Sequence, residues 1–363
     1  MEKCPVTIFV TVYNIENYLE RFFGCLGKQT YKDYKVLILD DGSTDNSLSI
    51  CRAHAEKDSR ITVVANEHVG IVPIRNKSIA MLDTEFAACL DGDDFFEPDY
   101  LKHLMDAQKK YDADFVISNV IYVTHEGDET SRFSPRKEAF FTKEQLPDIL
   151  PELLEEERLN YVYTKLYRTK YLKDVQIEPD VKYGGDTLIN MQYALHINNL
   201  AVIEAYDYYY IQHPTQSITS KQGTDFFWRL YRINKYLYDL TEQNGLLNDK
   251  MKRVIDERIL LSGKIALRHI GGMSVSMTTK LEAAHKTIHS DEYLLSYNRL
   301  KENGQLDSLR YKVIHPSEED AFIHEVCTKK RIIKKHRILT HTPKFISTAY
   351  HKVKTHLRNT TTK

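Results

Sequence analysis

The sequence predicts an α/β fold, with a mostly parallel central sheet flanked by helices, followed by a helical C-terminal region. In the first third of the chain, short runs rich in β-branched residues alternate with segments of helical periodicity, which is typical of βαβ units. Beyond Gly223, apolar residues recur at three- and four-residue spacing, as on one face of a helix. Since domains commonly hold about 100–200 residues, a chain of 363 residues predicts two or three folded units.

Four buried strands are expected in the first third, because four apolar runs stand there and each is followed by polar residues. These strands cover residues 6–12, 35–39, 61–64 and 86–90. The segments between them carry apolar residues at helical spacing and predict helices. The helices cover residues 18–26, the segment after Asp45 through Cys51, and residues 71–82.

The middle of the chain mixes both kinds of element. Pro98 suits the first turn of a helix that we expect to end near Tyr111, and residues 114–121 have the composition of a fifth strand. Residues 124–151 are charged and contain glycine and proline, which favours an irregular, mobile excursion. Later elements are expected as helices at 161–172 and 187–197 and as one strand, or two short ones, at 201–210.

Charge is unevenly distributed, although the whole chain carries a formal net charge of −1. After Glu325 no acidic residue remains, while eleven lysines and arginines follow, so residues 329–363 form a basic tail. A basic and partly amphipathic segment can lie on an anionic membrane face, and the alternative is a solvated tail. Nucleic acid is not an expected partner, because no recognition fold accompanies the charge.

Cysteine content and the N-terminus bear on the compartment. The five cysteines are odd in number and lack metal-ligand spacing, which favours a reduced, cytoplasmic setting over a disulfide framework. Residues 1–5 lack the pattern of a signal peptide, and no apolar run approaches the ~20 residues needed to span a bilayer. We expect a cytoplasmic protein, either soluble or peripheral on the inner face of the cell membrane.

Three carboxylates within four residues form the most conspicuous polar cluster, Asp91-Gly92-Asp93-Asp94. Carboxylates crowded in this way repel one another, and a divalent cation such as Mg²⁺ or Mn²⁺ among them reverses the local electrostatics. Taken alone, such a short cluster is more often a solvated acidic turn after a strand. Tyr13 and Asp41 also follow strands, however, and the carboxyl ends of parallel strands meet at one edge of a sheet. We therefore expect the three segments to converge on one crevice.

Several motifs together resemble the family 2 glycosyltransferases, which have the GT-A fold. In chain order they are Val10-Thr11-Val12-Tyr13-Asn14, Gln29-Thr30-Tyr31, Asp40-Asp41-Gly42-Ser43-Thr44-Asp45, Arg75-Asn76, Leu90-Asp91-Gly92-Asp93-Asp94 and Tyr183-Gly184-Gly185-Asp186. The resemblance implies a catalytic domain at 1–222, with a nucleotide-binding half at 1–123 and an acceptor-side half at 124–222. A helical domain at 223–328 and the tail at 329–363 would follow.

The resemblance also implies an activity, which is inverting transfer of a hexosyl or N-acetylhexosaminyl group from a UDP-sugar to an acceptor hydroxyl, with Mn²⁺ or Mg²⁺. The acceptor would be a glycan, a polyol phosphate or a glycoprotein in the synthesis of a bacterial surface polysaccharide, teichoic acid or glycoprotein glycan.

The implied roles follow the motifs. Tyr13 would lie against the uracil beside Val12 and Glu16, Asp41 would bind the base, and Arg75 would face the nucleotide or its phosphates. Asp91 would meet the ribose and the metal, Asp93 would coordinate the metal, Asp94 would face the donor sugar, and Asp186 would be the general base. His213 and Ser217 would contact the diphosphate or the metal, in place of an arginine that is usual in the family.

Two other functions remain open at the level of sequence. A sugar nucleotidyltransferase also uses an α/β domain and metal-binding aspartates, but it needs a glycine-rich basic loop where Tyr13-Asn14-Ile15-Glu16 stands. An inactive carbohydrate-binding or scaffold protein would explain why Gly185 replaces the usual glutamate and Ile211 the usual arginine.

The apolar stripes beyond Gly223 fit packing within one chain, and a homo-oligomer is the alternative.

Overall fold

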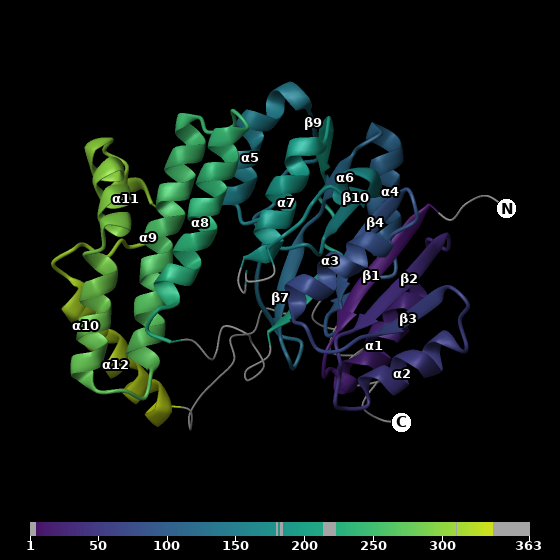
Figure 1. Ribbon diagram of the computed structural model, residues 1–363, viewed down its shortest axis with the longest axis horizontal. Helices are drawn as coiled ribbons and strands as arrows, with labels where there is room; N and C mark the ends of the chain where they lie inside the picture. The colour runs from purple at the N-terminus through teal and green to yellow at the C-terminus, as the bar shows by residue number, and fades with distance from the viewer. Residues whose placement is uncertain (1–4, 179–180, 182–183, 213–222, 310, 337–363) are drawn as a thin grey trace. The chain divides into compact units, whose positions relative to one another are not determined.

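The computed structural model describes residues 5–178, 181, 184–212, 223–309 and 311–336, with side chains up to residue 327 (Figure 1). The chain divides into two compact units, of which residues 1–214 belong to the first and residues 215–345 to the second. None of the helices in these described ranges is both long enough and apolar enough to cross a membrane.

An eight-stranded sheet forms the centre of the first unit, in the order β3-β2-β1-β4-β10-β6-β11-β9. Four strands at one end are mutually parallel: β1 (Val6–Val12), β2 (Tyr34–Asp40), β3 (Ile61–Ala65) and β4 (Phe86–Asp91). The other half is mixed and comprises β10 (Lys165–Arg168), β6 (Phe115–Ile117), β11 (Asn199–Val202) and β9 (Ala139–Thr142). The sheet is thus the predicted one in its first half.

Register brings three polar strand ends to one edge of this sheet. Val12 pairs with Asp40, the last residue of β2, and Thr11 pairs with Asp91, the last residue of β4. Each of these strands is followed by the segment that the sequence predicted to meet its neighbours. The expectation that Tyr13, Asp41 and the 91–94 cluster lie at the same edge is confirmed by the strand pairing.

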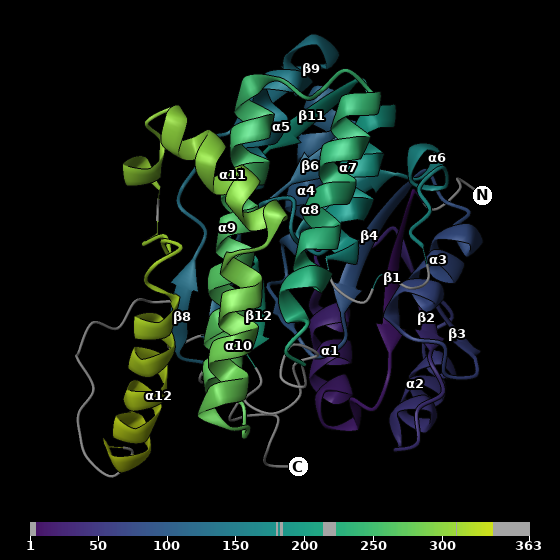
Figure 2. The same cartoon turned by 60° about the vertical axis from the view of Figure 1, so that its left-hand side comes forward.

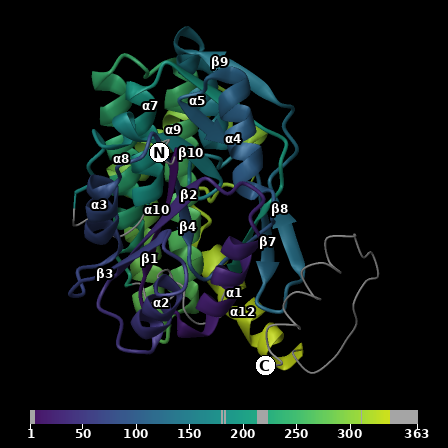
Figure 3. The same cartoon turned by 90° about the vertical axis from the view of Figure 1, so that its right-hand side faces the viewer.

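Helices cover both faces of the sheet. They are α1 (Glu16–Lys28), α2 (Ser47–Ala55), α3 (Ile71–Met81), α4 (Tyr100–Tyr111), α5 (Leu146–Glu155), α6 (Thr169–Leu172) and α7 (Gly185–His196), with a 3₁₀ turn at Lys143–Gln145. Leu19 of α1 and Leu101 of α4 join alternate β1 residues in one apolar core. Figure 3 shows α1 and α4 on one side of the sheet and α3 and α7 on the other.

A second, four-stranded sheet stands beside the carboxylate cluster. Its order is β5-β12-β7-β8, with β5 (Phe95–Phe96), β12 (Tyr208–Gln212), β7 (Val120–Thr124) and β8 (Glu129–Arg132). β5 follows the cluster directly and pairs with β12, so that Tyr208 stands opposite Phe96. This pairing places β12 against the acidic turn that carries Asp94.

Three sequence predictions in the middle of the chain are wrong. The expected strand at 114–121 is two strands in different sheets, β6 and β7, because Asn119 turns away and donates to the carbonyls of Ile203 and Ala205 at 3.0 and 3.2 Å. The expected helix at 161–172 is strand β10 followed by the short α6, since sheet pairing on both sides overrides local propensity. The supposedly irregular 124–151 contains β8, β9 and α5.

The second unit is helical, as predicted. It holds α8 (Phe226–Gln243), α9 (Asp249–Gly272), α10 (Met277–Ile288), α11 (Asp291–Glu302), a 3₁₀ turn at Leu306–Ser308 and α12 (Glu319–His336). The side chains of Asn248, Ser276 and Ser290 cap α9, α10 and α11 by accepting from backbone N–H groups. α9 contacts all four of the other helices (Figure 2). Its buried residues therefore form the centre of this unit.

Candidate active site

The acidic turn after β4 begins the site. Gly92 packs tightly against Ile15, the residue that precedes α1. A Cβ at Gly92 would lie 2.7 Å from the Ile15 Cδ1 atom. Arg21 of α1 donates from its Nη2 to the carbonyl oxygen of Asp93, which ties the turn to that helix. Two of the three carboxylates, Asp91 and Asp93, are partly exposed, whereas Asp94 is 1% exposed. The three carboxylates of the turn therefore lie in different environments.

Asp94 is held by β12. Its Oδ2 accepts a hydrogen bond from the Tyr208 hydroxyl at 2.6 Å, and its Oδ1 accepts one from the Ile211 backbone N–H at 2.8 Å. Burial raises the pKa of the Asp94 carboxyl well above its usual value, and the neighbouring Asp93 and Asp91 raise it further. The carboxyl oxygens that were predicted to face a donor sugar thus bind the second sheet.

The buried Arg75 and the partly exposed Asp186 form an ion pair that joins α3 to α7. Arg75 is 5% exposed; its Nη1 donates to Asp186 Oδ1, and its Nη2 lies 3.8 Å from Asp91 Oδ1. Burial alone would lower the pKa of Arg75, but Asp186, Cys89 and Asp91 raise it above its usual value. The arginine is therefore a fixed positive charge between the two aspartates, to which the sequence had given separate roles.

Asp186 stands in the first turn of α7, where the helix dipole favours a carboxylate. Its Oδ2 accepts from the Val162 backbone N–H at 3.4 Å. The helix begins after Gly184, whose φ of +64° is left-handed. Gly185 lies against α3, because a Cβ there would be 3.2 Å from Val72 Cγ2. This contact gives a packing reason for a glycine where a glutamate is usual.

Asp91 lies in a strongly acidic neighbourhood. Burial raises the pKa of its carboxyl, Arg75 lowers it, and Asp93 and Asp186 raise it. Asp91, Asp93 and Asp186 thus lie near one another, and Arg75 pairs with Asp186 and approaches Asp91. Hard oxygen ligands in such a group suit Mg²⁺ or Mn²⁺. These residues therefore have the chemistry that suits the divalent ion implied by the resemblance, and Asp93 and Asp91 are the ones that would hold it.

Tyr13 and Asp41 lie on the neighbouring strand ends. The Tyr13 ring stacks on His68 with centroids 4.2 Å apart, and 43% of Tyr13 is exposed. Asp41 Oδ1 accepts from the Val69 N–H at 2.8 Å, and its Oδ2 accepts from the Gly70 N–H at 2.9 Å. The carboxylate thus fixes the loop that carries His68. Its predicted contact with a nucleobase stays a prediction.

Val12 and Glu16 have structural partners. The Val12 carbonyl accepts from the Asp41 N–H at 2.8 Å, which joins the ends of β1 and β2. Glu16 Oε2 accepts from the backbone N–H and the side-chain Nδ2 of Asn46, at 2.9 and 2.7 Å. Glu16 therefore clamps α1 to the start of α2. His213 and Ser217, the two predicted diphosphate contacts, lie outside the described residues.

Sequence reasoning missed four residues that shape the site: Arg21, His68, Lys165 and Tyr208. His68 follows a strand end and could have been found by the same rule that selected Tyr13. Tyr208 lies in a run of tyrosines that carried no sign of which one faces the cluster. Lys165 is fully buried beside the site, and it was hidden because its segment was taken for a helix. No signal distinguished Arg21 from other helix-surface arginines.

The sequence of this chain is similar to those of known glycosyltransferases. A family model described as glycosyl transferase family 2 matches residues 7–175. The glycosyltransferase GlyA of Streptococcus pneumoniae is 28% identical over 193 residues, which cover 52% of this chain and 27% of GlyA. Poly(ribitol-phosphate) β-N-acetylglucosaminyltransferase TarS of Staphylococcus aureus is 25% identical over 248 residues, covering 65% of this chain and 41% of TarS. The match thus spans less than half the length of either relative.

Solved structures extend the likeness beyond the family model. The crystal structure of residues 1–349 of Staphylococcus aureus TarS matches with a TM-score of 0.60 and 18% identity, covering 92% of this chain and 93% of that one. At that identity the likeness shows the fold, which is the GT-A-like sheet with a helical C-terminal region. Residues 7–175 thus form a domain that matches the glycosyl transferase family 2 model, and the curated relatives named above are glycosyltransferases.

Proposed function

We propose that the protein is a metal-dependent enzyme that transfers a hexosyl or N-acetylhexosaminyl group from a UDP-sugar, with inversion, to a hydroxyl of a bacterial cell-surface polymer. The observation that carries this proposal is the ion pair of Arg75 with Asp186 beside Asp91, at the same sheet edge as the acidic turn. One arginine joins a single carboxylate base on α7 to the carboxylates that suit a divalent ion. Inverting transfer needs both parts and only one base.

The donor side is assigned to the strand ends. Tyr13, stacked on His68 and exposed on its outer part, offers an aromatic surface for a uracil ring. Asp93 and Asp91 would hold Mn²⁺ or Mg²⁺, and the bound ion would stabilise negative charge on the departing diphosphate as a Lewis acid. TarS, which shares the fold, has been solved in complex with UDP and with UDP-GlcNAc, and this supports a UDP-sugar as the donor.

The acceptor side is assigned to Asp186. An acceptor hydroxyl must lose its proton as its oxygen attacks the anomeric carbon, and a carboxylate within hydrogen-bond reach can take that proton. Arg75 pairs with Asp186 and so holds the proposed base beside Asp91. Asp94, held by Tyr208, fixes the turn that carries the metal ligands.

The acceptor class is proposed from the relatives. The name of TarS identifies it as a transferase of N-acetylglucosamine to poly(ribitol phosphate). A polyol phosphate or a related surface glycan, in teichoic acid or polysaccharide synthesis, is therefore the acceptor that we propose, with a glycoprotein as the third class. The match of residues 7–175 to the glycosyl transferase family 2 model argues against the sugar nucleotidyltransferase alternative.

Location and assembly are proposed on the sequence alone. We assign the enzyme to the cytoplasm, with the basic tail at 329–363 on an anionic membrane face. The tail lies beyond the residues whose side chains are described. Flotation with vesicles containing phosphatidylglycerol should retain the full chain and lose a chain ending at residue 328. Light scattering after gel filtration would show whether the C-terminal helices also form a homo-oligomer.

A donor screen tests the proposed activity. Release of UDP should be measured with UDP-Glc, UDP-Gal, UDP-GlcNAc and UDP-GalNAc, each with Mn²⁺ and again with EDTA. One donor should be turned over, and EDTA should abolish its turnover. Asp93→Asn should lose turnover, while the exposed Asp106→Asn serves as a matched control. If no UDP-sugar is turned over and calorimetry detects no binding of UDP with Mn²⁺, the inactive carbohydrate-binding alternative is supported instead.

A further inference from the structure

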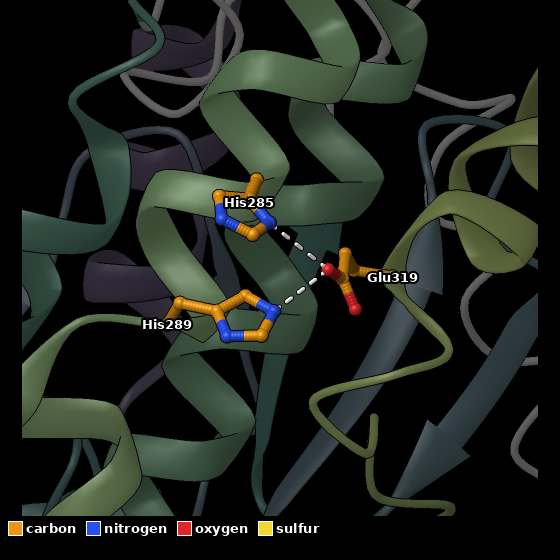
Figure 4. A group of neighbouring side chains, drawn as sticks. All are labelled: His285, His289 and Glu319. Carbon is orange, nitrogen blue, oxygen red and sulfur yellow. Dashed lines mark hydrogen bonds and ion pairs between the residues drawn. The ribbon is translucent and has the colours of Figure 1, made fainter.

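Two histidines and a glutamate meet in the second unit, apart from every residue assigned to the transferase. His285 lies in the last turn of α10, His289 follows directly at the end of that helix, and Glu319 is the first residue of α12 (Figure 4). The i, i+4 spacing puts both imidazoles on one face of the helix. Figure 4 shows both rings directed at the Glu319 carboxylate, which comes from the other helix.

The three groups are close enough to share one ion. Glu319 Oε1 lies 3.3 Å from His285 Nδ1 and 2.8 Å from His289 Nε2. The two imidazole rings are stacked with centroids 4.1 Å apart. One nitrogen of each ring and one carboxylate oxygen all lie within 4.8 Å of one another. An ion at about 2.0–2.2 Å from each atom can be reached by small side-chain rotations.

A second observation concerns the other carboxylate oxygen. Glu319 is 7% exposed, and its Oε2 is buried without a hydrogen-bond partner among the residues that the structure describes. A buried carboxylate oxygen without a partner is unfavourable, since its hydration has been lost and not replaced. Hydrogen bonds to the two histidines account for Oε1 only. The group therefore has capacity to bind a cation that these hydrogen bonds leave unused.

We propose that His285, His289 and Glu319 bind one divalent transition-metal ion of the zinc class, with water as a fourth ligand. Two imidazole nitrogens and one carboxylate oxygen form a ligand set that suits Zn²⁺, whereas Mg²⁺ and Mn²⁺ prefer oxygen ligands. The proposed ion joins the end of α10 to the start of α12. It belongs wholly to the second unit, while the carboxylates of the transferase belong to the first.

The proposed ion stabilises the fold of the second unit. The connection between α11 and α12 is long, and its described residues include the short 3₁₀ turn Leu306–Ser308. A metal bridge across that connection holds the start of α12 on α10 more firmly than one hydrogen-bonded carboxylate can. An ion that binds the folded form shifts the unfolding equilibrium toward it, so the melting temperature rises with zinc concentration.

Cobalt titration tests the site directly. Tag-free protein is stripped with a chelator, exchanged into chelator-free buffer and titrated with Co²⁺, followed by Zn²⁺. We expect one equivalent of Co²⁺ with the strong visible absorption of a four-coordinate site, displaced by Zn²⁺. His289→Gln and Glu319→Gln should lose that absorption and weaken zinc binding by more than the ~10–100-fold that loss of an outer partner costs. The exposed His196→Gln in the first unit is the matched control and should behave as wild type.

Further variants separate this site from the acidic turn of the transferase. Asp93→Asn should keep the cobalt absorption, and His285→Gln, at an exposed position, should lose it. Circular dichroism confirms that each variant is folded, and UDP release provides a second check for the histidine and Glu319 variants. The proposal is overturned if wild-type protein shows no four-coordinate cobalt spectrum, or if the histidine variants keep the same spectrum and zinc affinity as wild type.

Discussion

A single arginine sets the electrostatics of the site at the scale of the residue. Arg75 contacts Asp186 through one Nη atom and approaches Asp91 through the other. A guanidinium presents a planar fork of donors, which a lysine ammonium cannot reproduce. The removal of a buried charge partner leaves the other charge unpaired. The geometry of the proposed base therefore depends on this side chain as an arginine.

Arg75→Lys keeps the charge and removes the fork. We expect kcat/KM for UDP release to fall by about 100-fold, because displacement of a catalytic group by about 1 Å can have an effect of that size. Steady-state UDP release measures it, and the exposed Arg52→Lys is the control. Wild-type kinetics in Arg75→Lys, with the fold intact, would show that the fork has no catalytic importance.

The buried Lys165 should make the free energy of unfolding depend on pH. It is fully buried, and its Nζ donates to the Tyr163 carbonyl and the Thr164 hydroxyl, each at 3.1 Å. Burial lowers the pKa of Lys165 to about 7, while Asp186 raises it and Arg158 lowers it further. In the unfolded chain a lysine titrates near pH 10.4. Between these values the unfolded chain holds a proton that the folded protein lacks.

Between about pH 7 and about pH 10, Lys165 should therefore make the free energy of unfolding rise with pH. Below pH 7 it should add nothing to that slope, because the lysine is then protonated in both states. Lys165→Met should remove that component, which urea titrations at pH 7, 8 and 9 would reveal as a smaller slope than in wild type. Lys32→Met, at an exposed position, is the control. Equal slopes in wild type and Lys165→Met would refute the assignment.

The contacts between helices and strands explain why some elements were predictable and others were not. The first four strands and their helices follow the periodicity of their own residues. In contrast, β10 exists because Leu166 and Tyr167 pair with residues of β6 and β4, far away in sequence. Asn119 breaks the predicted strand at 114–121 through bonds to carbonyls more than 80 positions later. Such information is not present in a local window.

The site follows the same division. Tyr13, Asp41 and the 91–94 cluster were placed at one edge from the sequence, since parallel strands dictate it. The pairing of Arg75 with Asp186 joins residues 111 positions apart, and no local pattern indicates it. Likewise, the binding of Asp94 by Tyr208 depends on how the second sheet closes on the turn.

Two glycines in helices test helix packing. A Cβ at Gly263 of α9 would lie 2.5 Å from Tyr293 of α11, which is fully buried, while a Cβ at Gly24 of α1 would meet nothing within 4 Å. Gly263→Ala should therefore destabilise the second unit, by about 1–3 kcal/mol for an overpacked core. Gly24→Ala should stabilise the first unit by about 0.5–1 kcal/mol, because alanine favours a helix.

Chemical or thermal unfolding of the two glycine variants, compared with wild type, measures both effects. The same change of side chain is predicted to have opposite signs at the two positions. If Gly263→Ala stabilises the protein as Gly24→Ala does, the prediction that Gly263 and Tyr293 are in close contact is refuted.

The whole molecule consists of two units with separate ligand chemistry. The first unit holds oxygen ligands suited to Mn²⁺ or Mg²⁺, and the second holds the imidazole-rich site proposed for zinc. A ligand stabilises the unit that binds it, by about 2.7 kcal/mol at 100 times its dissociation constant. Each ligand should therefore act on a different part of the unfolding profile.

Scanning calorimetry can compare these effects. UDP with Mn²⁺ should raise the melting temperature in wild type and in His289→Gln alike, but should have a much smaller effect in Asp93→Asn. Zinc should raise it in Asp93→Asn and not in His289→Gln. A loss of both responses in either variant would mean that the two sites are not separate.

Pre-steady-state release of UDP is the most direct test of Asp186 as the general base. Wild-type protein and Asp186→Asn are mixed with the donor found in the screen and Mn²⁺, while calorimetry records the binding of UDP to each. We predict that Asp186→Asn binds UDP as wild type does and releases UDP from the donor about 10²–10⁴ times more slowly, as loss of a general base requires. Release at the wild-type rate would contradict the assignment of Asp186 as the base.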